Sequence, residues 1–455
     1  MVTTSPKAVI QLPAGPRIPP TVQLMNWLGR PYPFLDDCVQ RYGDLFTVRL
    51  GSLTPIVFCS NPAGNQAIFK AEPGRFDVGR TNGLLQPLVG TASILLLDGD
   101  RHQRQRQILM PPFHGERMRA YGTLIGDLTR QATADWSSQQ PFAVRPVMQE
   151  ISLRVILQAV FGLSQGEQYE ELRLRVSRLL DMTGSPLSSS LLFIEWLQKD
   201  LGAWSPWGQF VHQRSQVDQI LYREIGDRRT HLDPDRPDIL TLLLLARDAE
   251  GNPMSDLELR DELMTLLLAG HETTASALAW ALYWIHEHPS VRDALLTELD
   301  GVSLTEPMAI ARLPYLSAVC QETLRIYPIT PIAMPRLVLN EPFDLLGHAI
   351  PPETMVAPCI YLTHHREDLY PDAHQFRPER FLERQFSPYE FLPFGGGNRQ
   401  CVGMAFALFE MKLVLATLLT QFSLTRVGDR PLYPTRRGVT LAPPSTLRMV
   451  ATPRS

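Results

Sequence analysis

Cysteine is scarce in this chain of 455 residues, which contains only five. They are widely separated, at positions Cys38, Cys59, Cys320, Cys359 and Cys401. An odd, scattered set of cysteines does not make a disulfide framework, and it indicates a reducing compartment. We therefore expect a cytoplasmic protein whose cysteines are free.

The chain also lacks a strong excess of charge, a low-complexity run, an internal repeat and a Gly/Ser-rich linker. A formal net charge of −4 argues against a nucleic-acid partner. Length alone would allow two or three domains. Because no linker divides the sequence, we expect one domain over residues 1–455, with the core of an ordinary soluble globular protein.

No N-terminal stretch is apolar enough to form a signal peptide or a membrane anchor, since residues 1–20 are polar and proline-rich. The internal stretch Leu263–Ile285 is strongly apolar, but His271 and Glu272 near its middle would be costly in lipid. We interpret it as a buried helix and expect no transmembrane anchor.

Hydrophobic periodicity and capping residues predict a mainly α protein. The longest helix begins after the cap Ser255 and would be on the order of 50 Å long. Helices are expected at 33–42, just after Asn61, from 98 onwards, and at 119–136, 147–161, 168–182, 209–229, 239–249, 256–288, 291–299 and 313–327. Strands are expected at 45–50 and 54–59, a loop at 77–91, and an extended, proline-rich chain from 328 to 401.

The most informative stretch is Phe394-Gly395-Gly396-Gly397-Asn398-Arg399-Gln400-Cys401-Val402-Gly403, which leads into the largely apolar residues 404–422. Three glycines permit a tight turn close to a flat ligand. Cys401 is expected in the first turn of the following helix, where free N–H groups stabilise a thiolate. A thiolate in such a place suits haem iron, although the spacing alone leaves a structural cysteine as an alternative.

Other ligand sites do not match this stretch. A phosphate-binding loop needs Gly-Lys-Ser/Thr after the glycines, and a dinucleotide fingerprint needs a third glycine where Gln400 stands. Zinc would need a second cysteine or a histidine nearby, and none occurs between Phe394 and Phe422.

A second polar motif, Ala269-Gly270-His271-Glu272-Thr273-Thr274, interrupts the apolar helix at 256–288. A zinc-protease motif is excluded because Ala275 stands where a second histidine is needed. One interpretation is a threonine that bonds back to the preceding turn, with Glu272 on a wet face. The other is a hydroxyl and a carboxylate that together relay protons during oxygen activation.

These segments resemble the cytochrome P-450 family. The cysteine stretch has the family's form FxxGxRxCxG, and residues 269–274 match its A/G-G-x-D/E-T-T motif. Further matches, in the family's order, are the His102/Arg106 pair, Glu322-Thr323-Leu324-Arg325 and Phe376-Arg377-Pro378-Glu379-Arg380-Phe381. The resemblance spans Leu12 to the C-terminus.

The resemblance implies a large helical region at about 98–327 and 376–422. It also implies a small β-rich portion at about 12–75 and 328–375 plus the C-terminal strands. Haem b would lie between the long central helix and the cysteine-ligand helix, with Cys401 as the axial thiolate and metal ligand. Gly270 would line the oxygen groove, Glu272 would be the acid and Thr273 the alcohol.

The resemblance also assigns residues that would hold the cofactor and the region behind it. The cofactor-binding residues would be His102, Arg106, Arg336, Phe394, Arg399, Cys401 and Gly403, with the basic residues facing the propionates. A structural triad would consist of Glu322, Arg325 and Arg380.

The implied activity is insertion of one oxygen atom from O2 into a lipophilic fatty acid, alkane or terpene. The pocket would include Leu84, Leu88, Ala269, Ile332 and Ala333, together with Leu191, Leu192, Phe193 and Trp196 of the irregular segment 183–207.

Electrons would come from a separate ferredoxin or flavodoxin with its reductase, because no such domain is fused to the chain. A basic patch of Arg101, Arg104, Arg117, Arg119 and Arg399 would dock that partner. We expect a soluble monomer of bacterial or cyanobacterial type. Two alternatives remain: a peroxide-using or isomerising haem enzyme of the same fold, and a non-catalytic haem- or lipid-binding protein.

Overall fold

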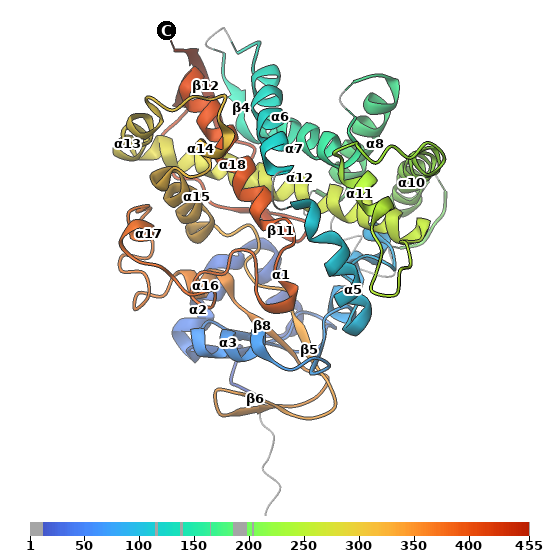
Figure 1. Cartoon of the computed structure of the whole chain (residues 1–455). Helices are drawn as coiled ribbons and strands as arrows, with labels where there is room; N and C mark the ends of the chain where they lie inside the picture. Colours follow the sequence, from blue (N-terminus) through green and yellow to red (C-terminus); the bar gives the residue numbers. More distant parts are fainter. Residues whose placement is uncertain are drawn as a thin grey trace, which may run out of the picture. The chain divides into compact units, whose positions relative to one another are not determined.

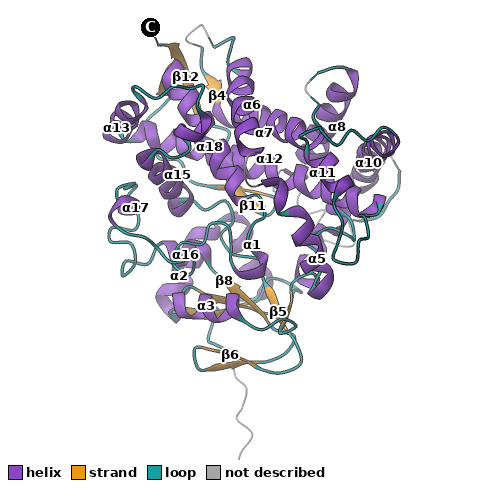
Figure 2. Ribbon diagram, in the orientation of Figure 1, coloured by secondary structure: helices purple, strands orange, loops and turns teal. Residues whose placement is uncertain are grey.

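The computed structural model describes residues 12–113, 117–136, 140–163, 165–184, 198–202 and 204–454 (Figure 1). Helices dominate and the strands form small sheets, as Figure 2 shows, so the prediction of a mainly α fold is confirmed. The chain divides into two compact units. Unit 1 comprises Met1–Gly83, Pro331–Pro371 and Phe386–Gln400, and unit 2 comprises Leu84–Thr330, Asp372–Gln385 and Cys401–Ser455.

Unit 1 is built around a five-stranded sheet of order β1-β2-β8-β5-β3, in which the β2–β8 pair is parallel and the other pairs are antiparallel. Its strands are β1 (Leu45–Val48), β2 (Ile56–Cys59), β3 (Phe76–Asp77), β5 (Arg336–Val338) and β8 (Met355–Pro358), with a separate hairpin of β6 (Phe343–Leu345) and β7 (His348–Ile350). Its helices are α1 (Pro20–Gly29), α2 (Pro31–Tyr42), α3 (Pro62–Lys70), α16 (Ile360–His364) and the 3₁₀ turn η4 (Gly397–Arg399).

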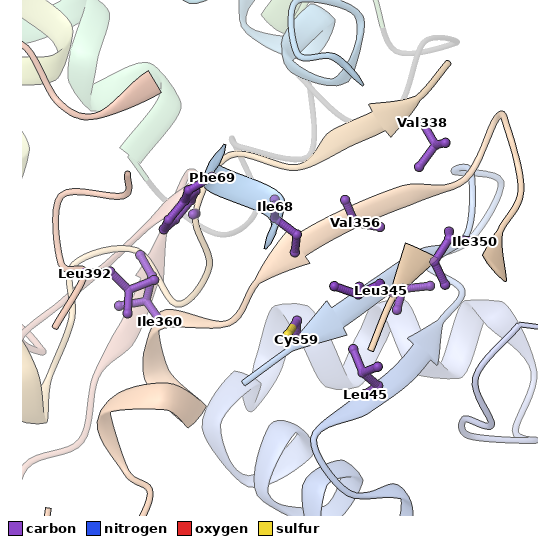
Figure 3. Packing of buried hydrophobic residues seen from close by; sticks show 12 residues of the cluster. Leu45, Cys59, Ile68, Phe69, Val338, Leu345, Ile350, Val356, Ile360 and Leu392 are labelled. Carbon is purple, nitrogen blue, oxygen red and sulfur yellow. The ribbon is translucent and has the colours of Figure 1, made fainter. Parts of the chain in front are cut away.

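The core of unit 1 lies between this sheet and α3 (Figure 3). Every residue of β1, β2 and β8 is buried, which explains their continuous apolar runs. Val57 and Val356, on paired strands, pack with Ile68 and Phe69 of α3 and with Leu392 from just before the cysteine loop. The core therefore fixes one end of that loop.

Unit 2 is a helical assembly in which α7 and α12 lie side by side (Figure 1). Its helices are α4 (Gln86–Val89), α5 (Gly99–Leu109), η2 (Pro111–Phe113), α6 (Arg117–Ala132), α7 (Val144–Phe161), α8 (Glu167–Gly184), α10 (Pro206–Thr230), α11 (Ile239–Leu245), α12 (Asp256–Glu287), α13 (Pro289–Leu299), α14 (Pro307–Ile310), α15 (Pro314–Ile326), α17 (Arg380–Glu383) and α18 (Met404–Gln421). Its strands are β4 (Phe142–Ala143), β9 (Phe422–Arg426), β10 (Thr435–Arg437), β11 (Thr440–Ala442) and β12 (Arg448–Pro453).

Both predicted N-cap residues, Ser255 and Asn61, cap their helices in the structure. Ser255 and Glu258 form a reciprocal capping box at the start of α12, and the Asn61 side chain accepts the Ala63 N–H at the start of α3. Among the described residues, α18 is the one helix long and apolar enough to cross a membrane, and 61% of its span is buried inside the protein.

Three local predictions are wrong. The stretch 77–91 is not a loop, because it contains β3, the 3₁₀ turn η1 (Arg80–Leu85) and α4. Helix α11 ends at Leu245, earlier than expected. The chain from 328 to 401 is not simply extended, since it forms β5 to β8 and the short helices α16 and α17.

Two guanidinium groups share one buried carboxylate in unit 2. Arg325 Nε lies 2.6 Å from Glu322 Oε2, and Arg380 Nε lies 3.1 Å from Glu322 Oε1. Arg325 also donates to the Ala373 carbonyl (2.8 Å), and Glu322 accepts the Arg377 N–H (2.8 Å). The structure thus brings together the three residues of the proposed triad and joins α15 to the segment around α17.

Removing the shared carboxylate should strongly destabilise the protein. Glu322→Gln would leave two buried cations without a counter-charge, and we expect a loss of about 3–5 kcal/mol in the free energy of unfolding, measured by urea denaturation. The exposed pair Arg292–Asp293 provides the control, because Asp293→Asn should leave the transition unchanged. Equal effects of the two variants would contradict the assignment.

The glycines of the cysteine loop pack against α3. Gly395 and Gly397 have φ of +66° and +65°, in the left-handed region. A Cβ on Gly396 would lie 2.5 Å from the Phe69 ring, and one on Gly397 would lie 2.5 Å from the Phe69 carbonyl oxygen. Both the backbone conformation and the closeness of Phe69 therefore require glycine.

Gly397→Ala should be costly because the new Cβ meets backbone that cannot rotate away. We expect a loss of about 2 kcal/mol or more in unfolding free energy, from the left-handed conformation and the clash together. Gly29→Ala, in the last turn of α1, is the control, since nothing lies within 4 Å of its Cβ position and its φ is not positive. That variant should be neutral or stabilising in the same urea titration.

Candidate active site

Cys401 lies before α18 rather than within its first turn. Helix α18 begins at Met404 with Gly403 as its N-cap, so the expectation of a cysteine inside the helix is wrong. The Gly403 N–H still donates a hydrogen bond to the Cys401 sulfur. Gly403 therefore lies close to the sulfur.

The Cys401 side chain has accessible surface, whereas the other four cysteines are buried. Surrounding protein nevertheless raises the pKa of the Cys401 thiol, and the Gly403 N–H and the Arg106 guanidinium oppose this rise. The nearby N–H group and the Arg106 charge thus favour the thiolate, as expected, while burial opposes it. A cation at the sulfur would be needed to remove the proton.

Helix α5 carries His102 and Arg106 on one face, four residues apart. His102 is buried and Arg106 is partly buried. Burial lowers the pKa of Arg106 and the nearby Cys401 sulfur raises it, so this guanidinium lies within electrostatic reach of the cysteine. Both residues belong to unit 2, like Cys401.

Unit 1 contributes the other two basic residues, Arg336 and Arg399. Arg336 is 4% exposed and donates to the carbonyl oxygens of Ile68 (2.6 Å) and Gly396 (3.0 Å). Its Nε has no hydrogen-bond partner, and no carboxylate pairs with it in the part of the chain that the structure describes. Burial and the positive charge of Arg399 lower its pKa to about 10.

A buried cation with an unused donor and a second cation nearby fits an anionic ligand. The carboxylates of haem propionates have the required charge and geometry. Phe394, at the start of the loop, is partly buried in the same unit. Within unit 1, the unsatisfied guanidinium of Arg336 therefore fits a propionate, and within unit 2 the accessible sulfur of Cys401 fits an iron ligand.

Helix α12 carries the oxygen-activation motif near its middle. Thr273 Oγ1 donates to the Ala269 carbonyl oxygen at 2.5 Å, which is the back-bonded arrangement. Ala269 is exposed and Gly270 and Glu272 are partly exposed, although the rest of this helix is largely buried. A Cβ on Gly270 would meet the tip of Ile156 at 3.0 Å, so α7 approaches closely there.

The carboxylate of Glu272 is held by side chains from other elements. It accepts from Arg145 Nη1 (2.8 Å) and Gln149 Nε2 (2.5 Å), both on α7, and it lies 3.4 Å from Arg437 Nε on β10. The acid and Thr273 therefore share no direct hydrogen bond in this structure. The sequence reasoning missed all three partners of Glu272, because they lie on other elements of the fold.

Two buried carboxylates nearer the start of α12 fix the segment that links α4 to α5. Asp261 Oδ2 accepts the Ala92 N–H (2.7 Å), and Glu262 Oε1 accepts the Ile94 N–H (2.7 Å) and Gln105 Nε2 (3.0 Å). Burial raises the pKa of Glu262 to about 8. These contacts connect the long helix to the helix that carries His102 and Arg106, and the sequence reasoning missed them too.

The predicted substrate residues are placed as follows. In unit 2, Leu84 is partly buried in η1, Leu88 is buried in α4 and Ala269 is exposed on α12. In unit 1, Ile332 is partly buried and Ala333 is buried, with its N–H bonded to Pro358. The residues Leu191, Leu192, Phe193 and Trp196 lie outside the described part of the chain.

The predicted basic patch is only partly available for docking. Arg104 forms ion pairs with Asp248 and Glu258, each at 2.7 Å, so its charge is neutralised. Arg117 donates to the Pro237 carbonyl oxygen (3.3 Å), whereas Arg101 and Arg119 are exposed. Arg104 therefore adds little to the predicted basic patch, and the docking role of the patch stays a prediction.

Comparisons with known proteins agree with this geometry. The family model described as Cytochrome P450 matches residues 13–449. The cytochrome P450 135B1 of Mycobacterium tuberculosis is 38% identical over 426 residues, covering 92% of this chain and 88% of the relative. The cytochrome P450 138 of the same species is 35% identical over 460 residues, covering 99% and 98% of the two chains.

Solved structures show the same fold. A retinoic acid-bound cyanobacterial CYP120A1 superposes with a TM-score of 0.83 at 26% identity, covering 98% of this chain and all of the other. The haem domain of cytochrome P450DA superposes with a TM-score of 0.82 at 22% identity, covering 98% of each chain, which shows the fold alone. The chain belongs to the cytochrome P450 family and is a monooxygenase that uses haem with an axial cysteine thiolate.

Proposed function

We propose that Cys401 supplies the thiolate, that the substrate is lipophilic, and that the electrons come from a separate acidic ferredoxin or a flavodoxin with its reductase. The observation that carries the ligand assignment is the contrast among the five cysteines. Cys401 has accessible surface, while burial raises the pKa of Cys38, Cys59 and Cys320 to about 12 and also raises that of Cys359. Those four thiols remain protonated and inert.

The residues around Cys401 prepare the sulfur without ionising it. The Gly403 N–H donates to the sulfur and the Arg106 charge favours its anion, while burial opposes ionisation. A coordinating metal cation deprotonates a thiol outright. Haem, when bound, supplies the iron at which oxygen is activated, and Arg106, Arg336, Arg399 and His102 would hold its propionates.

Two side chains of the α12 motif would have to move before the motif delivers a proton. Thr273 must turn its hydroxyl from the Ala269 carbonyl, and Glu272 must leave at least one of its α7 donors. Arg145 and Gln149 therefore hold the acid back from the alcohol until it is released. This arrangement supports controlled proton delivery rather than a permanent connection.

Several observations support the choice of substrate and partner. The residues assigned to the pocket are apolar, and a structural neighbour is described as retinoic acid bound. We infer a fatty acid, alkane or terpene substrate.

Arg101 and Arg119 are exposed cations that suit an acidic electron donor. Free cysteines suit the cytoplasm, and one family model spans both units, so we propose a single cytochrome P450 domain.

The ligand assignment is tested on the purified holoprotein. The reduced, carbon monoxide-treated protein should show the red-shifted Soret band of thiolate ligation, and Cys401→Ser should abolish it while Cys320→Ser keeps it. Fatty acids, alkanes, terpenes and retinoic acid are then titrated while the Soret band is followed for the high-spin shift. A spectrum typical of imidazole ligation would contradict the assignment of Cys401 as the ligand. A high-spin shift with polar compounds alone would contradict the lipophilic substrate class.

Removing the Thr273 hydroxyl should separate electron use from product formation. In Thr273→Ala, we expect product per reducing equivalent to fall several-fold and hydrogen peroxide to rise, because protons are no longer delivered in an ordered way. Thr297→Ala is the control, since that threonine makes the same kind of back-bond (2.9 Å to Asp293 O) on α13. Unchanged product yield, measured with isotopically labelled O2, would refute the relay.

A further inference from the structure

The carboxylate of Glu272 is held differently at its two oxygens. Arg145 Nη1 donates to Oε1 at 2.8 Å, and Arg437 Nε lies 3.4 Å from the same oxygen. Among the described residues, Oε2 accepts a single hydrogen bond, from Gln149 Nε2 at 2.5 Å. One oxygen therefore faces two cations, while the other faces a neutral amide.

The partners of this carboxylate come from two separate elements. Arg145 and Gln149 lie one turn apart on α7, whereas Arg437 ends β10, where it pairs with Thr440 of β11. The hairpin of β10 and β11 is in contact with α12. Arg437 Nε is buried and makes no hydrogen bond with the described residues, so it meets Glu272 as an ion pair only. Oε1 is thus held by a helix and by a hairpin.

The two α7 donors differ in what their release would cost. Arg145 is 9% exposed, and a buried guanidinium that loses its carboxylate is strongly destabilising. Gln149 carries no charge and is partly exposed, so water can replace the bond to its amide. Gln149 is therefore the donor that Glu272 can leave at the lower cost.

The free acceptor position of the carboxylate lies on the same oxygen. An ionised carboxylate has about two acceptor positions on each oxygen. Both guanidinium groups face Oε1, and a hydrogen added there would point towards a cation. Gln149 uses one position of Oε2 and leaves the other open. A proton can therefore add to Oε2 without displacing either arginine.

We propose that Arg145 and Arg437 anchor Glu272 through Oε1. Oε2 is the atom that carries the proton, after the Gln149 amide has left it. A proton from water adds to Oε2 and then passes to Thr273 Oγ1, whose own hydrogen moves on, so that the carboxylate is restored. Arg437 and Gln149 act through Glu272 and are positioning residues.

The proposal has a structural part and a functional part. The unequal hold on the two oxygens of Glu272 does not depend on any reaction. Its effect on product formation rests on the proton delivery that is proposed above for Glu272 and Thr273. The two parts are therefore tested by separate measurements.

The other charged groups nearby leave the two arginines dependent on this carboxylate. Burial lowers the pKa of Arg145, Glu272 opposes that fall and Arg437 adds to it. Asp181 of α8 acts in the same direction as Glu272 and more weakly. His271 is buried, which lowers its pKa to about 4, so it adds no positive charge near pH 7. Because the two guanidinium groups repel each other, each is stabilised by the oxygen that they share.

Infrared spectra of the holoprotein test the unequal hold without any turnover. The Glu272 carboxylate bands are identified as those lost in Glu272→Gln. Uneven loading of the two oxygens widens the separation between the antisymmetric and symmetric carboxylate stretches. Gln149→Leu unloads Oε2 and should widen this separation, whereas Arg437→Met unloads Oε1 and should narrow it.

Arg292→Gln is the control for the infrared experiment, because this arginine forms an exposed ion pair with Asp293 on α13. It should leave the Glu272 bands unchanged. Shifts of the same sign in Gln149→Leu and Arg437→Met, or no shift in either, would overturn the anchor.

Product per reducing equivalent tests which oxygen carries the proton. Arg145→Gln removes the charge at Oε1 and should lower the yield several-fold, towards that of Glu272→Gln. Gln149→Leu keeps the anchor and should lose less product than Arg145→Gln. Arg145→Lys returns a cation to Oε1 and should recover part of the yield. A greater loss in Gln149→Leu than in Arg145→Gln would overturn the assignment of Oε2.

Arg437 gives a second comparison if Arg145→Gln fails to fold, since its side chain is 23% exposed. Arg437→Met should also lose more product than Gln149→Leu, and Arg437→Lys should recover part of it; the opposite order would refute the proposal. Infrared shifts of opposite sign in a protein that forms no product would refute the proton delivery and retain the anchor. Product formation without such shifts would refute the anchor and retain the oxygenase function.

Discussion

A buried charge without a counter-charge is the constraint on which this structure depends, because desolvation makes such a group costly. In unit 1, Arg336 is buried with an unused Nε, and the positive charge of Arg399 adds repulsion. In unit 2, burial raises the pKa of the Cys401 thiol. Haem carries an iron cation, which can neutralise a thiolate, and propionate anions, which can pair with a buried guanidinium. Binding of this cofactor should therefore contribute directly to stability.

The sequence predicted the helices better than the segments between them. Helix α12 has a capping box and a long apolar pattern, both of which are local signals, and its predicted bounds agree closely with the observed ones. The short η1 and α4 carry weak periodicity, and Asp261 of α12 accepts the Ala92 N–H just beyond them. Nothing in their own sequence indicates that distant carboxylate. Tertiary contacts thus decide their structure.

The sequence motifs identified the functional residues, but they did not identify the residues that contact them. Gly396 and Gly397 were expected to admit a flat ligand, but the structure shows that they also admit Phe69 of α3. Glu272 was identified from its motif, while Arg145 and Gln149, more than a hundred residues earlier in the chain, could not be assigned to it without knowing that α7 packs against α12. A linear pattern gives the reacting groups, and helix packing gives the groups that restrain them.

Glu272 and Glu410 illustrate how two carboxyl groups on different helices can be given different tasks by their partners. Glu272 has two charged or polar donors from α7 and partial access to solvent, which is the environment of an anion that must later be released. Glu410 is 1% exposed, and its Oε1 has no hydrogen-bond partner among the described residues, which is the environment of a neutral acid. Helix α7 supplies two of the donors that hold Glu272, so the packing of α7 against α12 restrains the acid of the motif.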